Sequence, residues 1–228
     1  MPESYAYILR NRPYRDNSRL LDIFTQENGR IPCIAHPVNK RGKIITGMLQ
    51  PFSYLHLQWH GRGDVVTLIQ ADEYGRHNIS ATELLKGLYL NELVLRLTQQ
   101  YFPLPELFNA YKQTLHRITN SEANPQALMR FELFLLQTLG YEINLYCDDA
   151  SGEIISLEAT YRYILQQGII RNNPDICQDD GFMISGALLI ALRDLNCMQR
   201  DNWQELRGFL DCSISDIAGK PLNSRKVL

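Results

Sequence analysis

The first 75 or so residues carry the hydrophobic pattern of short β-strands. Between Tyr5 and Arg10 the side chains alternate between two faces, as in a half-buried strand, and Arg12-Pro13-Tyr14 is expected to end that strand. Asn28-Gly29 is a strong signal for a tight hairpin between two further strands. The pattern predicts five strands, over residues 5–10, 18–26, 31–35, 47–59 and 65–71. Five short strands without a long helix fit a small closed barrel.

The hydrophobic period becomes helical after residue 80. Ser80 and Glu83 have the spacing of a capping box, Asn124-Pro125 forms an N-cap followed by a first-turn proline, and Gly140 is a C-terminal stop. Helices are predicted over residues 80–100, 103–118, 125–140, 185–195 and 202–214, whereas 142–180 is expected to be irregular. The chain is therefore predicted to be α+β. We predict an N-terminal five-stranded OB-fold barrel (residues 1–78), suited to holding a nucleic-acid backbone, and an α-helical C-terminal domain (79–228).

The composition is that of a globular protein with an uneven charge distribution. The 228 residues carry a formal net charge of −2. Residues 1–63 hold nine Lys and Arg against four Asp and Glu, a net +5, so the remainder carries −7. Contact with a polyanion is thus expected in the first domain alone. Neither a membrane-length apolar run nor a leader is apparent, and the five cysteines form no C-x-x-C pair, so we expect a cytoplasmic protein with free thiols.

Basic side chains near the predicted barrel loops are the candidate DNA contacts, because Lys and Arg neutralise phosphates. Tyr14 is the candidate for base stacking, whereas Phe52, Tyr54 and Trp59 are expected to pack inside. The candidate DNA-binding residues are Arg12, Tyr14, Arg19, Lys40, Arg41, Lys43 and Arg62. Gly61-Arg62-Gly63 lacks the spacing of a phosphate cradle and is interpreted as a tight hairpin that needs positive φ.

No motif for catalysis is found, and no cofactor or metal is expected. Asp148, Asp149 and Glu153 could bind a divalent cation, but an exposed acidic loop is the preferred interpretation. Farther upstream, Arg130 lies beside an apolar stripe with Leu133 and Leu136. Such a groove could receive a peptide that ends in a hydrophobic side chain and a carboxylate, although the residues alone favour an ordinary amphipathic helix.

Ten segments in one order along nearly the whole chain resemble the bacterial RecO family of DNA repair and recombination mediators. They are Arg12-Pro13-Tyr14, Leu20-Leu21-Asp22-Ile23-Phe24-Thr25, Asn28-Gly29-Arg30, Leu49-Gln50-Pro51-Phe52, Gly61-Arg62-Gly63-Asp64, Gly87-Leu88-Tyr89-Leu90-Asn91-Glu92-Leu93, Leu107-Phe108 with Tyr111, Arg130-Phe131-Glu132-Leu133, Leu139-Gly140-Tyr141, and Gly219-Lys220-Pro221-Leu222 with Ser224-Arg225.

The resemblance implies a protein that is not an enzyme. It implies binding to single- and double-stranded DNA, annealing of complementary strands, and help in loading RecA onto DNA coated by single-stranded DNA-binding protein. RecR is the implied partner, with RecF as a further candidate and no membrane contact. The resemblance also implies that the C-terminal domain (79–228) binds partners and that the protein is nucleoid-associated. The basic barrel residues would contact phosphates. Arg130, Leu133 and Leu136 would receive the acidic, phenylalanine-terminated tail of the coating protein.

Three family features differ in this chain. Family members commonly carry a richer Gly-Ala-Arg-type loop after the third strand, whereas this chain has the shorter basic loop His36-Pro37-Val38-Asn39-Lys40-Arg41. Many relatives carry two basic residues where this chain has Met129-Arg130, and zinc-binding relatives carry cysteine pairs that Cys147 and Cys177 lack, so no zinc is expected. Two other functions remain as alternatives. One is a protein-interaction scaffold with no direct role at DNA, and the other is a metal-dependent nuclease built on the acidic loop.

Overall fold

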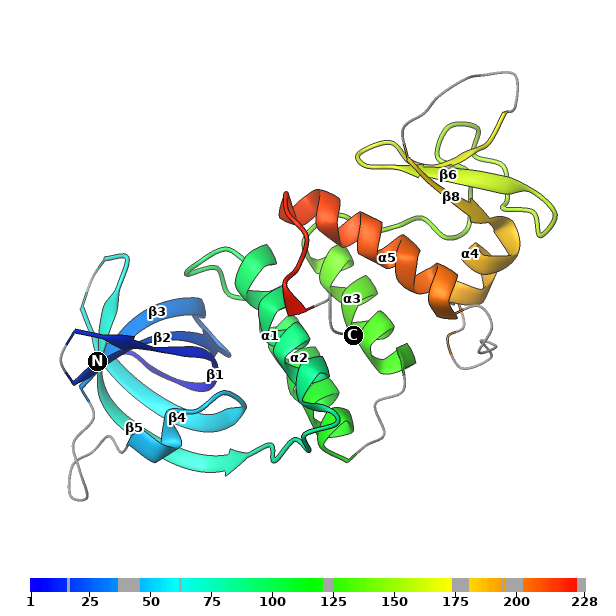
Figure 1. Cartoon of the computed structure of the whole chain (residues 1–228). Coiled ribbons are helices and arrows are strands. Elements are labelled where there is room, and N and C mark those ends of the chain that lie inside the picture. The colour runs from blue at the N-terminus through cyan, green and yellow to red at the C-terminus, as the bar shows by residue number, and fades with distance from the viewer. Residues whose placement is uncertain are drawn as a thin grey trace. The chain divides into compact units, whose positions relative to one another are not determined.

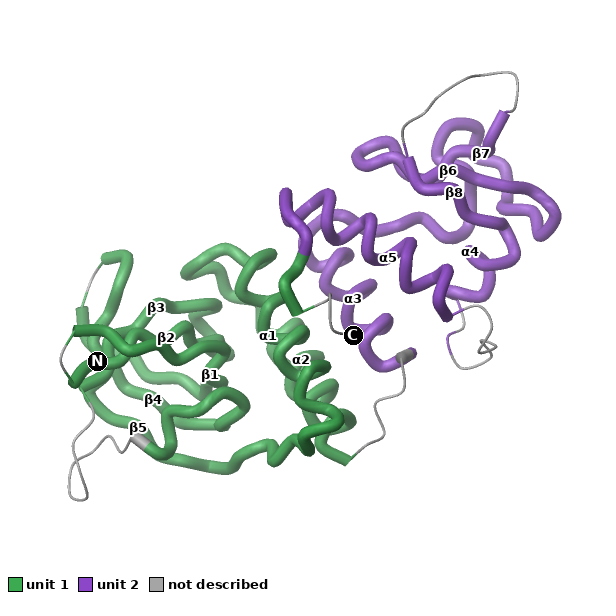
Figure 2. Tube along the Cα trace, viewed as in Figure 1, with its two compact units in different colours: residues 1–123, 222–228 green, residues 124–221 purple. Residues whose placement is uncertain are grey.

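The computed structural model describes residues 1–15, 17–36, 46–61, 63–120, 125–173, 181–193, 195 and 203–224 (Figure 1). The chain forms two compact units, one of residues 1–123 with 222–228 and one of residues 124–221 (Figure 2). The first two helices are thus grouped with the barrel, although the sequence pattern assigns them to the second domain.

The first unit contains a closed five-stranded barrel, which confirms the predicted fold class. Its strands are β1 (Glu3–Tyr14), β2 (Ser18–Thr25), β3 (Gly29–Ala35), β4 (Ser53–His60) and β5 (Val66–Arg76), and a short 3₁₀ turn (Thr46–Met48) precedes β4. They close in the order β1-β2-β3-β5-β4. The neighbours are antiparallel except for β3 and β5, which run parallel. This is the arrangement of an OB-like barrel.

Alternate side chains fill the barrel. Ile8, Ile23, Leu57 and Trp59 belong to its buried core, as the period-two pattern predicts. Tyr54 points to the other face of β4 and is only half-buried, where its ring stacks on Tyr5 at a centroid distance of 5.5 Å. The expectation that Phe52, Tyr54 and Trp59 all pack inside the barrel is therefore wrong for Tyr54.

β1 is longer than the sequence pattern predicts, because it continues through Pro13 to Tyr14. At this end β1 pairs only with β2, since its pairing with β4 stops at Tyr7, and a proline is tolerated beside a single neighbour. The register with β2 shifts between Ile8 and Arg10, which leaves Leu9 as an irregularity of the strand.

A buried polar chain uses the backbone that this shift releases. Asn91 Nδ2 donates to the carbonyl oxygen of Leu9 at 2.8 Å, and the hydroxyl of Tyr111 donates to Asn91 Oδ1 at 2.6 Å. Asn91 lies on α1 (Leu84–Leu97) and Tyr111 on α2 (Pro105–Thr119). Phe24 of β2 packs against both Phe108 and Tyr111. The two helices therefore cover the outer face of the barrel beside β1 and β2.

The predicted capping box at the start of α1 is wrong. The helix begins at Leu84, and its N-cap Glu83 makes no capping hydrogen bond through its side chain. The Glu83 carboxylate instead binds Lys86 Nζ at 2.6 Å, and the hydroxyl of Ser80 lies 2.9 Å from that of Thr82. Both predicted capping groups therefore have other partners.

The second unit contains three helices and a small sheet. The helices are α3 (Pro125–Thr138), α4 (Gly186–Arg193) and α5 (Trp203–Ala218), and the strands are β6 (Thr160–Ile164), β7 (Gly168–Arg171) and β8 (Phe182–Ser185), in the order β7-β6-β8. Gly140 ends the α3 segment with φ +83°, as predicted. Asn124 lies outside the described residues.

The three-stranded sheet corrects the expectation that residues 142–180 are irregular and that the second domain is wholly helical. Strands of four or five residues offer too few positions for a period of two to be recognised. Within the described ranges, no helix is long and apolar enough to cross a bilayer.

Candidate nucleic-acid surface and peptide pocket

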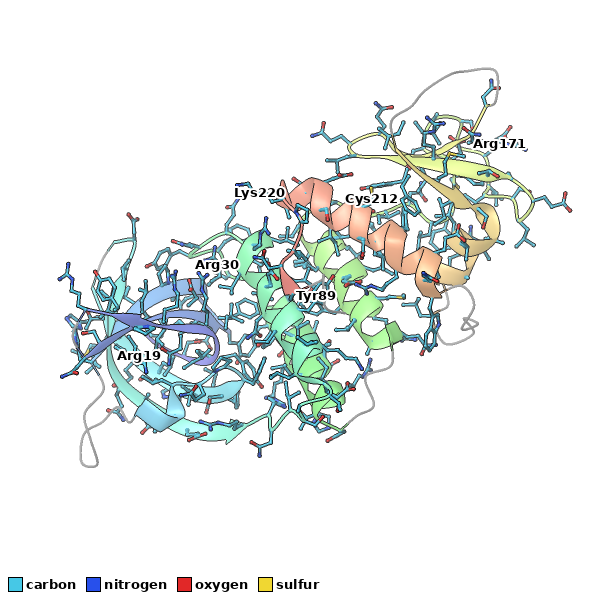
Figure 3. The ribbon with its side chains drawn as sticks, in the orientation of Figure 1. Arg19, Arg30, Tyr89, Arg171, Cys212 and Lys220 are labelled. Atoms are coloured by element: carbon cyan, nitrogen blue, oxygen red, sulfur yellow. The ribbon has the colours of Figure 1, made fainter. Side chains whose placement is uncertain are left out.

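The hairpin end of β1 and β2 places the described DNA-binding candidates on two faces. Residues paired across antiparallel strands project to the same side, and the pairs Arg10–Asp22, Arg12–Leu20 and Tyr14–Ser18 share one side. Arg19 pairs with Pro13, one residue out of phase, and therefore lies on the opposite face. Arg12, Tyr14 and Arg19 therefore lie at the same end of the barrel, but Arg19 lies on the other face. Figure 3 labels Arg19 in the barrel.

These candidates differ in surroundings. The side chain of Arg12 is 48% exposed and reaches within 3.8 Å of the Asp22 carboxylate. Tyr14 is half-buried, and the guanidinium of Arg15 lies 5.3 Å from its ring centre. Arg19 has no carboxylate within ion-pair distance among the residues that the structure describes.

The remaining basic candidates, Lys40, Arg41, Lys43 and Arg62, lie outside the described residues. Gly61 and Gly63, on either side of Arg62, have φ values of +114° and +145°. The hairpin interpretation of this glycine pair is therefore confirmed.

The expectation of an exposed acidic loop is confirmed for Asp149 and Glu153 but is wrong for Asp148, and the segment also has a structural role. Asp148 is only 4% exposed, and its carboxylate accepts hydrogen bonds from the backbone N–H groups of Ala150, Ser151 and Arg171. Asp149 accepts from the N–H of Ile169 at 2.7 Å. The two aspartates thus fasten the turn at 148–151 to β7.

Hydrogen bonding decides the charge state of Asp148. Burial alone raises the pKa of a carboxyl group, but the N–H donors of Ser151, Arg171 and Ala150, with the Ser151 hydroxyl, outweigh it and lower the pKa of Asp148. Among the described residues, no three His, Cys, Asp or Glu side chains are grouped to hold a metal ion.

A cavity of about 680 Å³ opens in the second unit, beside α3 and the end of α4. Arg130 and Leu133 line it, as the peptide-groove interpretation expects, together with apolar side chains that include Phe134 and Leu192. Leu136 does not line it, because this side chain is buried in the core of the unit (1% exposed). Met129 is also fully buried and does not line the cavity.

The sequence reasoning missed Arg193, the last residue of α4, which also lines this cavity. Its Nε donates to the carbonyl oxygen of Leu145 at 2.7 Å, and its guanidinium lies 4.8 Å from the ring centre of Tyr146. Its Nη2 is buried and has no hydrogen-bond partner in the described part of the chain. An arginine held in this way at an apolar cavity is suited to a carboxylate. In the sequence, Arg193 is a single basic residue at the end of an apolar segment. Such a residue is ordinarily solvated, so nothing marked it as part of a site.

A buried ion pair fixes the α3 wall of the cavity. Glu132 is fully buried, and its two carboxylate oxygens accept hydrogen bonds from Arg207 of α5 at 2.7 and 2.9 Å. A two-point pair of this kind restrains rotation of both side chains. Glu132 lies between Arg130 and Leu133 in the sequence, so the ion pair anchors to α5 the segment of α3 that carries these two lining residues.

The strand order and the parallel β3–β5 pairing define a protein built on an OB-like barrel, to which a mixed helix-and-sheet unit is added. The family model "Recombination protein O N terminal" matches residues 1–74, and "Recombination protein O C terminal" matches residues 81–226.

Curated relatives match this chain along most of their length. The chain is 33% identical to the DNA repair protein RecO of Aliivibrio salmonicida over 97% of the chain and 93% of that protein. The RecO protein of Azoarcus sp. is 33% identical over 98% and 93%, and that of Methylococcus capsulatus is 38% identical over 83% and 77%. The chain belongs to the RecO family, and its role lies in DNA repair and recombination.

Proposed function

We propose that this protein is a non-enzymatic recombination mediator that binds DNA with its barrel and a coating protein's tail with its second unit. The observation that carries the proposal is the presence of two chemically different surfaces in one chain. One is an OB-like barrel with half-exposed arginines, and the other is a cavity lined by apolar side chains, by two arginines and by Glu142.

The barrel supports DNA binding through charge. Arginine neutralises phosphate and releases counterions, so the binding constant falls steeply as salt is added. The proposal assigns phosphate contacts to Arg12, Arg19, the basic segment Lys40, Arg41 and Lys43, and Arg62, and it assigns base stacking to Tyr14. Residues 1–78 would thus act as the DNA-binding domain, and 79–228 as the domain for partners.

The cavity supports capture of an acidic tail that ends in phenylalanine. The terminal ring would occupy the apolar space beside Leu133, and the terminal carboxylate would meet Arg130 and Arg193. Leu136 contributes from beneath, as part of the core that supports α3. Burial of a phenyl ring contributes about 1.5 to 3 kcal/mol, which suits a reversible encounter.

Together these contacts would bring the barrel to DNA that is already coated. A tethered second site converts the next binding step into an intramolecular one and raises the local concentration of the barrel at the exposed strand. Annealing then needs no covalent chemistry, because neutralised phosphates reduce the repulsion between two strands. The same proximity supports a handover of the strand to RecA, with RecR and RecF as candidate partners in it.

The test is a fluorescence titration of a labelled single strand, with and without the coating protein, followed by an annealing assay with two complementary oligonucleotides. We expect binding that weakens sharply with salt, and annealing that accelerates on coated strands. Reversal of Lys40, Arg41 and Lys43 to Glu should abolish DNA binding and leave the circular dichroism spectrum unchanged. A protein that shows no DNA binding at low salt but still binds the tail peptide would instead be a protein-interaction scaffold.

A further inference from the structure

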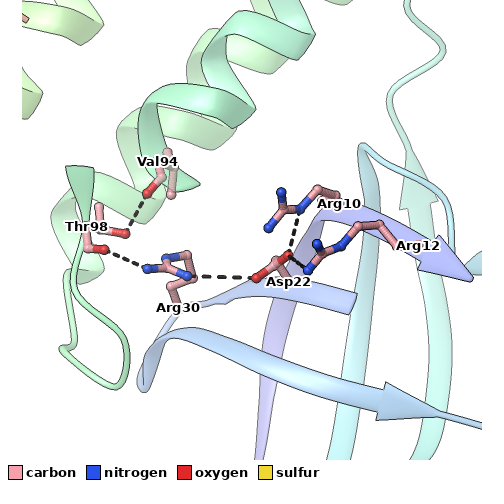
Figure 4. Close-up of polar contacts among 6 residues, drawn as sticks. All are labelled: Arg10, Arg12, Asp22, Arg30, Val94 and Thr98. Carbon is pink, nitrogen blue, oxygen red and sulfur yellow. Dashed lines mark hydrogen bonds and ion pairs between the residues drawn. The ribbon is translucent and has the colours of Figure 1, made fainter. Parts of the chain in front are cut away.

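Three arginines surround one buried carboxylate on the outer face of the barrel. Figure 4 shows Arg10 and Arg12 of β1 and Arg30 of β3 converging on Asp22 of β2. Arg10 Nε donates to Asp22 Oδ2 at 2.9 Å, and the closest nitrogens of Arg12 and Arg30 each lie 3.8 Å from a carboxylate oxygen. The side chain of Asp22 is only 7% exposed. We call these four residues the Asp22 cluster.

Arg30 has a structural role in the Asp22 cluster. Its side chain is 12% exposed, and its Nη2 donates to the carbonyl oxygen of Thr98, just after α1, at 3.0 Å. Burial lowers the pKa of Arg30, the Asp22 carboxylate opposes that shift, and the neighbouring Arg10 adds to it. Arg30 therefore joins the barrel to α1 and has little surface to offer to a ligand.

Arg10 and Arg12 are the members that face solvent. Their side chains are 46% and 48% exposed. One carboxylate among three guanidinium groups leaves an excess of two positive charges. This excess lies at the exposed side chains, those of Arg10 and Arg12. The two arginines stand two residues apart on one face of β1, and this spacing corresponds to about 7 Å along a strand.

We propose that Arg10 and Arg12 form a phosphate-binding pair and that Asp22 is the positioning residue that holds them in place. This proposal rests on the proposed function and names the part of the barrel that contacts the strand's backbone. Guanidinium groups match phosphate oxygens through two parallel hydrogen bonds. A carboxylate that restrains the two side chains beforehand reduces the rotamer entropy lost on binding. Tyr14 follows on the same face, where a base adjacent to the bound phosphates can stack on its ring.

The direct test replaces each exposed arginine with glutamine and measures single-strand binding over a range of salt concentrations. Arg10→Gln and Arg12→Gln should each weaken binding about 5-fold at low salt, and the double variant about 20-fold. The salt slope should fall by about 0.7 for each phosphate contact that is lost. Arg117→Gln, which removes the same charge from an exposed position of α2, is the matched control and should change neither quantity by as much as 2-fold.

The positioning role needs a readout that charge alone would not give. Asp22→Asn raises the net charge by one, so a purely electrostatic surface would bind DNA more tightly. We expect the folded Asp22→Asn protein to bind about 3-fold more weakly, and Asp22→Glu to recover part of the loss. Arg30→Gln should lower the midpoint of thermal unfolding and leave the salt slope unchanged.

The outcomes separate this proposal from the function on which it rests. If the wild type binds DNA but the double arginine variant keeps its affinity and salt slope, the phosphate pair is wrong and the mediator function stands. If folded Asp22→Asn binds as tightly as the wild type or more tightly, the positioning role is wrong. If Asp22→Asn does not fold, the arginine variants and Asp22→Glu still decide both points. No binding by the wild type would overturn the proposed function itself.

Discussion

The barrel and the second unit each contain a nearly buried aspartate, and the two carboxylates are stabilised in different ways. Asp22 in the barrel (5% exposed) meets three guanidinium groups, whereas Asp148 in the second unit (4% exposed) meets three backbone N–H groups. Cations around a carboxylate leave an excess of positive charge that can reach solvent. Backbone N–H groups carry no formal charge, so they leave no excess of positive charge and only anchor the chain. The same side chain therefore supports a binding surface in one unit and the local fold in the other.

Replacement of Asp148 with alanine should give the largest effect. Three N–H groups lose their acceptor at once, so we expect unfolding of the second unit to become easier by about 3 kcal/mol, which denaturant titration would measure. DNA affinity at low denaturant should be unchanged, in contrast to Asp22→Asn. A matched loss of DNA affinity in Asp148→Ala would break the distinction between the two aspartates.

The stabilisation by Asp148 should also depend on pH. The pKa of Asp148 is lowered in the folded protein, so its contribution is complete above the ordinary value near 3.8 and is lost as the pH falls through the folded pKa. The stability difference between the wild type and Asp148→Asn should thus be greatest near neutral pH and shrink in acid. A difference that grows in acid would contradict the hydrogen-bonding account.

A charge at the apolar wall of the cavity should give the next largest effect. Leu133→Asp would expose the terminal ring of the tail to an unpaired carboxylate, and we expect peptide affinity to fall about 30-fold, a cost of about 2 kcal/mol. Fluorescence anisotropy with a labelled acidic peptide that ends in phenylalanine measures this. Gln204→Asp adds the same charge at an exposed position of α5 outside the cavity and should have little effect.

Loss of one cavity arginine should have a smaller and more specific effect. Arg193→Gln should weaken peptide binding about 10-fold, the value of one hydrogen bond to a charged group. The amide-terminated form of the peptide, which lacks the terminal carboxylate, should bind the wild type and Arg193→Gln equally. If Arg193→Gln weakens both forms of the peptide alike, Arg193 supports the wall and does not recognise the carboxylate.

The smallest expected effect concerns the end of the described chain. The Glu92 carboxylate of α1 accepts the backbone N–H groups of Asn223 and Ser224, both at 2.8 Å. Burial opposes the charged form, but these bonds, the Ser224 hydroxyl and Arg96 together lower the pKa of Glu92. Glu92→Gln should cost about 1 kcal/mol of the stability of the first unit and should increase hydrogen exchange at Asn223. Unchanged exchange would show that this contact does not hold the segment.

Local signals predicted the parts of the fold that depend on local chemistry. Asn28-Gly29 and the glycines beside Arg62 predicted turns, because few residues other than glycine adopt a positive φ. Alternation of apolar and polar residues predicted the barrel strands. The register shift near Leu9 was not predicted, and the carbonyl oxygen of Leu9 is bound by Asn91, a residue far along the chain.

The candidate sites were predictable only in part for the same reason. Arg130 and Leu133 stood out because they share a helical stripe, whereas Arg193 reaches the same cavity from a helix about sixty residues later. Asp148 looked like an exposed acid because its donors include Arg171, in a strand too short to recognise. Sequence periodicity carries no information about contacts of this range.

The central claim is that the barrel binds by charge, whereas the cavity combines apolar burial with a carboxylate contact. Its most direct test is a single salt series on one preparation, with the affinity for a single strand and for the phenylalanine-terminated peptide measured at each concentration. We predict that the logarithm of the DNA affinity falls steeply with the logarithm of salt, while the peptide affinity falls with a smaller slope, because only its carboxylate contact is screened. Equal slopes for the two ligands would contradict the account.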